Sequence, residues 1–208
     1  MRFRATRKVS PAYVEFSPPF PQTLCIAGVD EVGRGPLAGP VIAAAVIFPP
    51  RFVIPGITDS KKLTPPQRET LFPLIRQGAL AIGLGYADPA VVDRLNILRA
   101  SLQAMKQAVL HLTRQPDLVL VDGNQPLDLP LEQSCLVRGD ARSLTIGAAS
   151  IVAKVVRDKV MEACHGRFPV YNFRANKGYG TAEHLEALRR HGPCPLHRLS
   201  FRGVRPDG

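Results

Sequence analysis

The sequence lacks paired metal-binding cysteines. Its four cysteines, Cys25, Cys135, Cys164 and Cys194, include no Cys-x-x-Cys pair, which argues against a zinc knuckle. Cys25 and Cys135 lie within apolar runs, where a thiol behaves as a small hydrophobic side chain. Because this usage is typical of a reducing cytosol, we expect a cytoplasmic protein.

Long apolar runs and acidic residues are also scarce. No stretch is long enough to cross a membrane, and the first residues contain no hydrophobic segment of a signal peptide. The 208 residues suffice for one domain with a real core and a small appendage. Only 17 Asp and Glu stand against 27 Lys and Arg, which gives a net charge of +10. This excess suggests a polyanionic partner, most often nucleic acid.

Two of the few acids interrupt an apolar run. Residues 25–40 begin like a buried strand but carry Asp30 and Glu31 side by side. Unpaired buried charge is costly, so something must compensate these carboxylates, and a bound cation is the obvious candidate. Gly33 and Gly35 follow, and glycine lets the backbone of a ligand come close. The segment therefore predicts a functional site.

Two further strand-like runs also end on an aspartate. They are residues 118–124, with Asp122, and residues 135–140, with Asp140. Ligands of open α/β sheets gather beyond the carboxyl ends of strands, so the three runs can converge. Either aspartate alone would fit an ordinary turn residue after a strand. Taken with the adjacent acids of the first run, they favour one acidic site.

The four acids offer only oxygen ligands. Hard cations such as Mg²⁺ or Mn²⁺ prefer that set, whereas zinc favours His or Cys. Carboxylate clusters of this kind hold two metals about 3.5–4 Å apart in nucleases and polymerases. One geometric condition applies to Asp30 and Glu31, because neighbouring strand residues point to opposite faces. They can share a site only if the strand ends or twists there.

Periodicity and capping signals predict alternating strands and helices. Strands are expected near 24–30, 40–48, 79–86, 118–121 and 132–138, and helices near 65–77, 142–164 and 181–191. Between them, a single helix is expected from Pro89, capped by Asp88, to Leu112. Pro73 is expected to kink or end the helix that contains it. His184 and His191 lack a third ligand at metal spacing, so surface or packing roles are predicted.

A competing motif lies beside the first acids. Gly33-x-Gly35-x-x-Ala38 matches the dinucleotide-binding pattern, and Asp59 follows at about the right distance. However, the two acids before it would repel a pyrophosphate, and residues 41–48 suggest a strand where that motif requires a helix. A lone glycine fingerprint is weak support for such a site.

Six segments together carry a family resemblance. They are GVDEVGRGPLAGPV at 28–41, DSKKL at 59–63, VDGN at 121–124, GDARSLTIGAASIVAKVVRD at 139–158, NKGYGT at 176–181 and HRLSF at 197–201. In this order, from about residue 23 to 204, the chain resembles the type 2 ribonuclease H family, specifically its bacterial ribonuclease HII members. The resemblance implies a ribonuclease H-like α/β fold: a mixed five-stranded sheet flanked by helices, with a small C-terminal helical portion. It also implies cleavage of the RNA strand of RNA–DNA hybrids, and incision of DNA duplexes at embedded ribonucleotides. Its products would carry 5′-phosphate and 3′-hydroxyl ends.

The resemblance also implies roles for individual residues. The family's metal-binding catalytic acids, which hold two Mn²⁺ or Mg²⁺ ions, match Asp30, Glu31, Asp122 and Asp140. The loop and tyrosine with which the family recognises the junction between RNA and DNA match Gly33, Arg34, Gly35 and Tyr179. The 2′-hydroxyl distinguishes the two sugars there. Further backbone contacts are expected from Lys61 and Lys177, and Asn176 replaces the histidine of many relatives.

The chain is expected to have three parts, of which the first falls outside the resemblance and is inferred from its composition alone. Residues 1–22 are expected to form a loosely ordered basic arm, residues 23–165 the catalytic core, and residues 166–208 a basic helical portion that completes the substrate site. RNA–DNA hybrid and ribonucleotide-containing DNA are the expected partners, and no membrane or obligate protein partner is implied for what we expect to be a monomer. Two alternatives stay open: a nuclease of the same fold that does not discriminate sugars, and a non-catalytic basic protein that binds nucleic acid.

Overall fold

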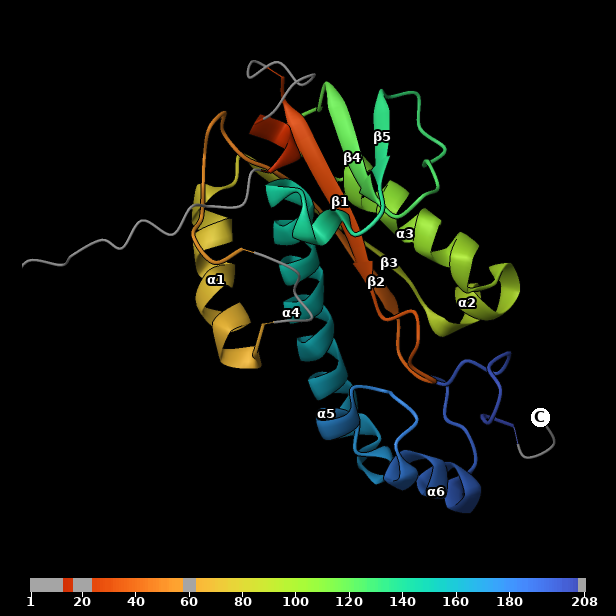
Figure 1. Ribbon diagram of the computed structural model, residues 1–208. Helices are drawn as coiled ribbons and strands as arrows, with labels where there is room; N and C mark the ends of the chain where they lie inside the picture. Colours follow the sequence, from red (N-terminus) through yellow and green to blue (C-terminus); the bar gives the residue numbers. More distant parts are fainter. Residues whose placement is uncertain (1–12, 17–23, 58–62, 206–208) are drawn as a thin grey trace, which may run out of the picture.

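A mixed five-stranded sheet forms the centre of the computed structural model, which describes residues 13–16, 24–57 and 63–205 (Figure 1). Its strands are β1 (Ile26–Val32), β2 (Val41–Ile47), β3 (Ala81–Ala87), β4 (Leu118–Asp122) and β5 (Gln133–Leu136), in the spatial order β3-β2-β1-β4-β5. β2 is antiparallel to β1 and β3, whereas β1, β4 and β5 run parallel. The fold class predicted from the sequence is confirmed. The chain after Ala38 enters β2, not the helix that a dinucleotide motif requires.

Helices cover both faces of this sheet (Figure 1). One face carries α1 (Pro65–Gly78) and α4 (Leu144–Arg167), and the other carries α2 (Pro89–Leu95) and α3 (Ile97–Leu110). Beyond the end of α4 lie α5 (Phe173–Asn176) and α6 (Ala182–His191). Short 3₁₀ turns complete the order at Val14–Phe16 (η1), Gly139–Ala141 (η3) and Pro169–Tyr171 (η4). No helix within these described ranges has the length and apolarity needed to span a membrane.

The sheet separates two hydrophobic cores because β2 is buried on both faces. Its alternate residues Ile42, Ala44 and Val46 pack in the core under α1 and α4. Val41, Ala43 and Ala45 pack in the core under α3. Strands covered on both faces are typically continuous hydrophobic runs, which explains the uninterrupted apolar sequence of β2.

Helix α4 lies unusually close to β1. A Cβ atom at Gly28 would stand 2.3 Å from the main-chain nitrogen of Ile146, in the first turn of the helix. Only glycine leaves room for this approach. Gly28 therefore sets the distance between β1 and the start of α4.

The predicted single helix from Pro89 to Leu112 is wrong, because the structure has two helices there. Asn96 adopts a φ of 70°, which interrupts the helix, and its side chain accepts a hydrogen bond from the amide of Arg99 to cap α3. Asparagine tolerates this conformation better than most residues. Leu98, in the first turn of α3, is 42% exposed. Pro73 does not end α1 either, since that helix continues to Gly78.

The start of α4 is capped from a distant part of the chain. The carboxylate of Glu15 accepts hydrogen bonds from the Ser143 hydroxyl and from the amide of Thr145 at 2.9 Å. A negative charge at a helix N-terminus is stabilising. The described residues 13–16 thus pack against the core, while the rest of the expected basic arm lies outside the described residues. The division of the chain into three parts remains a prediction.

Two buried histidines join the segments of the C-terminal portion. The amide of Cys194 donates to Nδ1 of His197 at 2.9 Å, so the proton of a neutral His197 ring is on Nε2. This Nε2–H donates to Nε2 of His184 at 3.0 Å. The Nδ1–H of His184 then donates to the carbonyl oxygen of Tyr179 at 2.8 Å. This chain of bonds requires both rings to be neutral, since a further proton would leave two donors facing each other. His184 has the packing role that the sequence suggested.

A first prediction follows from the contact between β1 and α4. The substitution Gly28→Ala forces the helix and strand apart and should lower the free energy of unfolding by about 1–3 kcal/mol, the usual range for overpacking. Thermal or denaturant unfolding measures this loss. Gly166→Ala, in the same helix but with open space around its Cβ, is the matched control and should be neutral or stabilising. Equal effects of the two substitutions would contradict the close approach.

A second prediction concerns acid stability. Burial, followed by the charge of His184, lowers the pKa of His197 to about 4, whereas an unfolded histidine has a pKa of about 6.5. Between these values the unfolded chain binds a proton that the folded chain does not. The free energy of unfolding should therefore decrease as the pH falls from about 6.5 toward 4, by up to about 1.4 kcal/mol per pH unit for this residue.

Denaturant unfolding at a series of pH values measures this slope. His197→Gln should flatten it, whereas His191→Gln, which alters an exposed histidine, should leave it unchanged. The same slope in His197→Gln and the unaltered protein would show that another group causes the dependence.

Candidate active site

Two of the predicted acids stand beside each other at the end of paired strands. The last residues paired between parallel β1 and β4 are Val29 and Val121. The next residue in each strand is an acid, Asp30 in β1 and Asp122 in β4. β4 ends at Asp122. Among the described residues, no strand therefore pairs with the β4-facing edge of β1 after Asp30.

Asp30 is a buried carboxylate in an acidic environment. It is 5% exposed, and its Oδ1 accepts a hydrogen bond from the amide of Glu31 at 2.7 Å. Burial, together with the negative charges of Glu31 and Asp122, raises the pKa of Asp30 well above its usual value, although a hydrogen bond from Ser150 opposes this. Such a group favours a cation close by.

Glu31 reaches the same cavity although β1 continues past it. Glu31 is paired with Ala43 in β2, so the strand does not end at the acids. The side chains reach one site because β4 stops there and leaves the flank of β1 open. Burial raises the pKa of Glu31, and Asp122 adds to the rise, while Arg34, whose Nη1 lies 3.3 Å from Glu31 Oε1, opposes it.

The segment after β5 connects Asp122 with the fourth acid. The amide of Gly139 donates to Oδ1 of Asp122 at 2.7 Å, and Asp140 follows directly in η3. Asp140 is buried and is not among the described residues that line the cavity. The structure thus brings three of the four acids to one cavity and places the fourth next in sequence to a residue that contacts Asp122.

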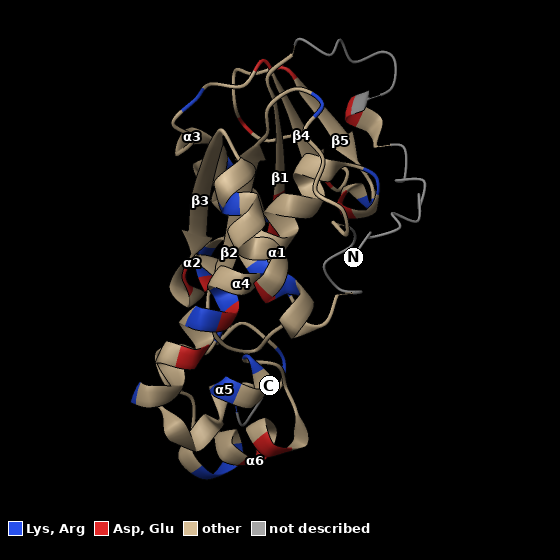
Figure 2. Cartoon of the chain, turned by 90° about the vertical axis from the view of Figure 1, so that its left-hand side faces the viewer, with Lys and Arg blue, Asp and Glu red and all other residues tan. Residues whose placement is uncertain are grey.

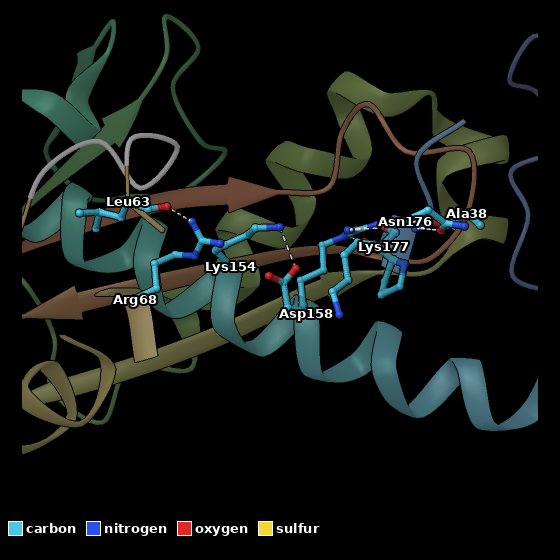
Figure 3. Close-up of polar contacts among 10 residues, drawn as sticks. Ala38, Leu63, Arg68, Lys154, Asp158, Asn176 and Lys177 are labelled. Carbon is cyan, nitrogen blue, oxygen red and sulfur yellow. Dashed lines mark hydrogen bonds and ion pairs between the residues drawn. The ribbon is translucent and has the colours of Figure 1, made fainter. Parts of the chain in front are cut away.

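The cavity combines an acidic wall with a basic rim. It has a volume of about 540 Å³, and its lining residues are Asp30, Glu31, Val32, Gly33, Arg34, Gly35, Arg68, Asp122, Ser150, Lys154 and Tyr179. Lys154 is paired with Asp158 at 2.7 Å, and Arg68 donates to the carbonyl of Leu63 (Figure 3). Further basic segments lie along α4 and on α5 and α6 (Figure 2). This arrangement suits a polyanion whose backbone reaches a cation site.

The loop and tyrosine predicted to recognise sugars lie against each other. A Cβ atom at Gly35 would stand 3.6 Å from Cε1 of Tyr179, and the tyrosine side chain is 48% exposed. Gly33 adopts a φ of 101°, which favours glycine. Lys177 lines an adjacent groove with Arg68 instead of the acidic cavity. Lys61 and Asp59 fall outside the described residues.

Sequence reasoning missed three polar residues of the cavity, Arg68, Ser150 and Lys154. Ser150, Lys154 and Asp158 are spaced four residues apart, so they share one face of α4. That spacing was the available signal. Nothing comparable in the sequence marks Arg68, because its position depends on how α1 packs against α4.

The donor set fits a hard divalent cation in its chemistry. Asp30, Glu31 and Asp122 present carboxylate oxygens, the ligands that Mg²⁺ and Mn²⁺ prefer. In the part of the chain that the structure describes, no three acidic, histidine or cysteine side chains converge closely enough to form a metal site as they stand. The carboxylates instead surround the cavity.

Comparison with known proteins identifies relatives along most of the chain. The family model "Ribonuclease HII" matches residues 27–204. Ribonuclease HII of Syntrophotalea carbinolica is 57% identical over 86% of this chain and 86% of that protein. Ribonuclease HII of Geobacter sulfurreducens is 56% identical over 86% of this chain and 83% of that protein.

Solved structures share the fold. Ribonuclease H2 of Pyrococcus horikoshii superposes with a TM-score of 0.73 at 26% identity, and the match covers 86% of this chain and 95% of that one. Bst-RNase HIII in complex with Mn²⁺ gives a TM-score of 0.70 at 19% identity, over 87% of this chain and 68% of that one. The matches with ribonucleases HII argue against the dinucleotide-binding and non-catalytic alternatives. The chain belongs to the ribonuclease HII family, whose members are type 2 ribonucleases H, endonucleases that act on RNA–DNA hybrids.

Proposed function

We propose that the chain hydrolyses the RNA strand of RNA–DNA hybrids and incises DNA duplexes at embedded ribonucleotides by two-metal chemistry. The observation that carries this proposal is one cavity lined both by Asp30, Glu31 and Asp122 and by the Gly33–Gly35 loop. Phosphodiester hydrolysis and recognition of a sugar can therefore occur at the same place. The products would carry 5′-phosphate and 3′-hydroxyl ends.

The acids would hold Mn²⁺ or Mg²⁺ in this cavity. Asp30, Asp122 and Asp140 are proposed as direct ligands, with Glu31 helping to place the second ion or its water. When bound, such ions activate water and stabilise the leaving oxygen. Ser150 orients the Asp30 carboxylate, and the amide of Gly139 orients that of Asp122. Bst-RNase HIII, a protein with the same fold, has been solved in complex with Mn²⁺.

The loop and Tyr179 would distinguish ribose from deoxyribose. Main-chain groups of Gly33, Arg34 and Gly35 can approach a 2′-hydroxyl, which both donates and accepts hydrogen bonds. The ring of Tyr179 can pack on the neighbouring sugar and reject one with the extra hydroxyl. Lys61 and Lys177 are proposed as contacts to the nucleic-acid backbone.

We further propose a cytoplasmic monomer in which residues 166–208 complete the substrate site. The half-exposed Tyr179, which belongs to this segment, lines the same cavity as the acids of the core. A complex of PCNA with RNase HII has been solved for Archaeoglobus fulgidus, whose chain superposes with a TM-score of 0.70 at 24% identity over 86% of this chain and 96% of that one. No obligate protein partner is proposed for this chain.

A third prediction tests the acidic site. Asp122→Asn removes one negative charge from the cavity but keeps the size of the side chain, so it should reduce cleavage of an RNA–DNA hybrid by about a thousandfold or more. Binding of the hybrid, measured by fluorescence anisotropy, should be largely retained, because the basic rim is intact. Asp128→Asn, at an exposed acid that pairs with Lys106, is the control and should cleave normally. Full activity of Asp122→Asn would refute the proposed site.

A fourth prediction tests the recognition of ribonucleotides. Tyr179→Ala should reduce incision of a DNA duplex with one embedded ribonucleotide by about tenfold to a hundredfold, the scale expected when a positioning contact is lost. The rate of incision and the position of the cut on a labelled strand measure this effect. Tyr86→Ala, at an exposed tyrosine on β3, is the control.

Two outcomes would count against the recognition of sugars. Unchanged incision by Tyr179→Ala would show that the tyrosine has only a structural role. Equal cutting of duplexes with and without the ribonucleotide by the unaltered protein would instead favour a nuclease of the same fold that does not discriminate sugars.

A further inference from the structure

A fully buried arginine lies beneath the proposed sugar-recognition loop. Arg198 has no exposed surface, and its guanidinium makes five hydrogen bonds to main-chain carbonyl oxygens. The acceptors all lie between β1 and β2, at Gly33, Arg34, Pro36 and Gly39. The arginine is far from this loop in sequence, since 159 positions separate Arg198 from Gly39.

These five bonds use every donor that Arg198 has. Nε donates once, to Gly39, while Nη1 donates to Arg34 and Pro36, and Nη2 donates to Gly33 and Gly39. An arginine side chain has five N–H groups in a fixed planar arrangement. No donor is left for a substrate, so Arg198 can act on the substrate only through the loop.

The positions of the carbonyl groups fix the directions of the neighbouring amides. In a trans peptide unit the C=O and N–H groups point in opposite directions. Because the carbonyls of Gly33 and Arg34 face Arg198, the amide N–H groups of Arg34 and Gly35 point away from it. Within the described residues, no hydrogen bond is recorded for either of these two amides. Both residues line the acidic cavity.

Arg198 is itself held firmly. The carboxylate of Asp93 accepts hydrogen bonds from the next two amides, those of Leu199 and Ser200, each at 2.9 Å. The guanidinium also lies 5.1 Å from the centre of the Phe201 ring. Burial, followed by the charge of Arg157, lowers the pKa of Arg198 to about 9, so the side chain remains protonated at neutral pH.

A second buried arginine extends this support to the next part of the loop. Arg157 of α4 donates to the carbonyls of Ala38, Pro40 and Lys177 at distances between 2.9 and 3.1 Å. It thereby joins the loop to the segment that leads to Tyr179. The two arginines thus hold the carbonyl groups of the loop, while the amides of Arg34 and Gly35 point away from Arg198.

We propose that Arg198 is a positioning residue for sugar recognition, which presents the free amides of Arg34 and Gly35 to oxygen atoms of the ribonucleotide, its 2′-hydroxyl included. The inference rests on the proposed function, since it assumes that this loop reads the sugar. It assigns the selectivity of the enzyme in part to a side chain that never touches the substrate.

The substitution Arg198→Lys tests this role. Lysine keeps the positive charge, but its three donors on one nitrogen cannot reach carbonyls spread around a planar guanidinium. The assay measures kcat/KM with Mn²⁺ on a DNA duplex with one ribonucleotide, and Ki for the same duplex made only of DNA. The ratio of Ki for the all-DNA duplex to KM for the ribonucleotide-containing duplex, here called the discrimination ratio, measures how well the enzyme distinguishes the two.

Arg198→Lys should lower kcat/KM by about tenfold to a hundredfold and should lower the discrimination ratio, since small displacements of positioning groups have effects of this size. The Ki for the all-DNA duplex should stay unchanged, because the basic rim is untouched. Met105→Ala, in the core under α3, serves as a control for lost stability and should leave the ratio unchanged. Arg198→Gln, an uncharged variant with two donors, should behave like Arg198→Lys.

Three results would overturn the positioning role. The first is an unchanged ratio in folded Arg198→Lys, and the second is the same loss of ratio in Met105→Ala. The third is failure of both Arg198 variants to fold, as judged by circular dichroism, because the residue would then be needed for folding as a whole. Failure of the proposed function can be told apart from failure of the Arg198 role. In that case the unaltered protein itself would show no preference for the ribonucleotide-containing duplex.

Discussion

The pairing of β1 with β4 is the constraint on which the site depends. It aligns Val29 with Val121 and so places Asp30 beside Asp122. Gly28, two residues before Asp30, allows the start of α4 to pack directly on β1, which brings Ser150 to the Asp30 carboxylate. A shift of one residue in this register would move every side chain of β1 to the other face of the sheet. The acids, the helix that supports them and the cavity therefore form one geometric unit.

Buried charges of both signs lie around this unit, and they are compensated in different ways. Asp30 is buried among other acids, and its pKa is raised by burial and by their negative charge. Arg157 and Arg198 are buried too, but each of their side-chain nitrogens donates to a main-chain carbonyl oxygen. A buried polar group is costly only when it lacks such partners. The buried arginines thus find their hydrogen-bond partners within the protein, whereas the acids are suited to bind a cation.

The C-terminal segment supports the site from outside the sheet. His184 and His197 connect the amide of Cys194 to the carbonyl of Tyr179, and the next residue in the chain, Arg198, holds the loop after β1. Asp93 of α2 fixes the residues that follow. The loop and the tyrosine proposed to read the sugar are therefore both held by hydrogen bonds from the C-terminal segment.

The sequence alone determined the order of the strands along the chain and the residue types of the acidic site. Apolar runs that end on aspartate, as at Asp122, are visible without a structure because strand burial and carboxylate chemistry are local properties. The break at Asn96 was not predicted, since the apolar spacing runs through it and only a backbone angle reveals it. Only the tertiary structure decided that Asp30 and Asp122 lie side by side, that Asp140 is buried next in sequence to the residue whose amide binds Asp122, and that Arg198 binds the loop. The first and last of these facts depend on contacts between distant residues, 92 positions apart for Asp30 and Asp122 and 159 for Gly39 and Arg198, which no local pattern encodes.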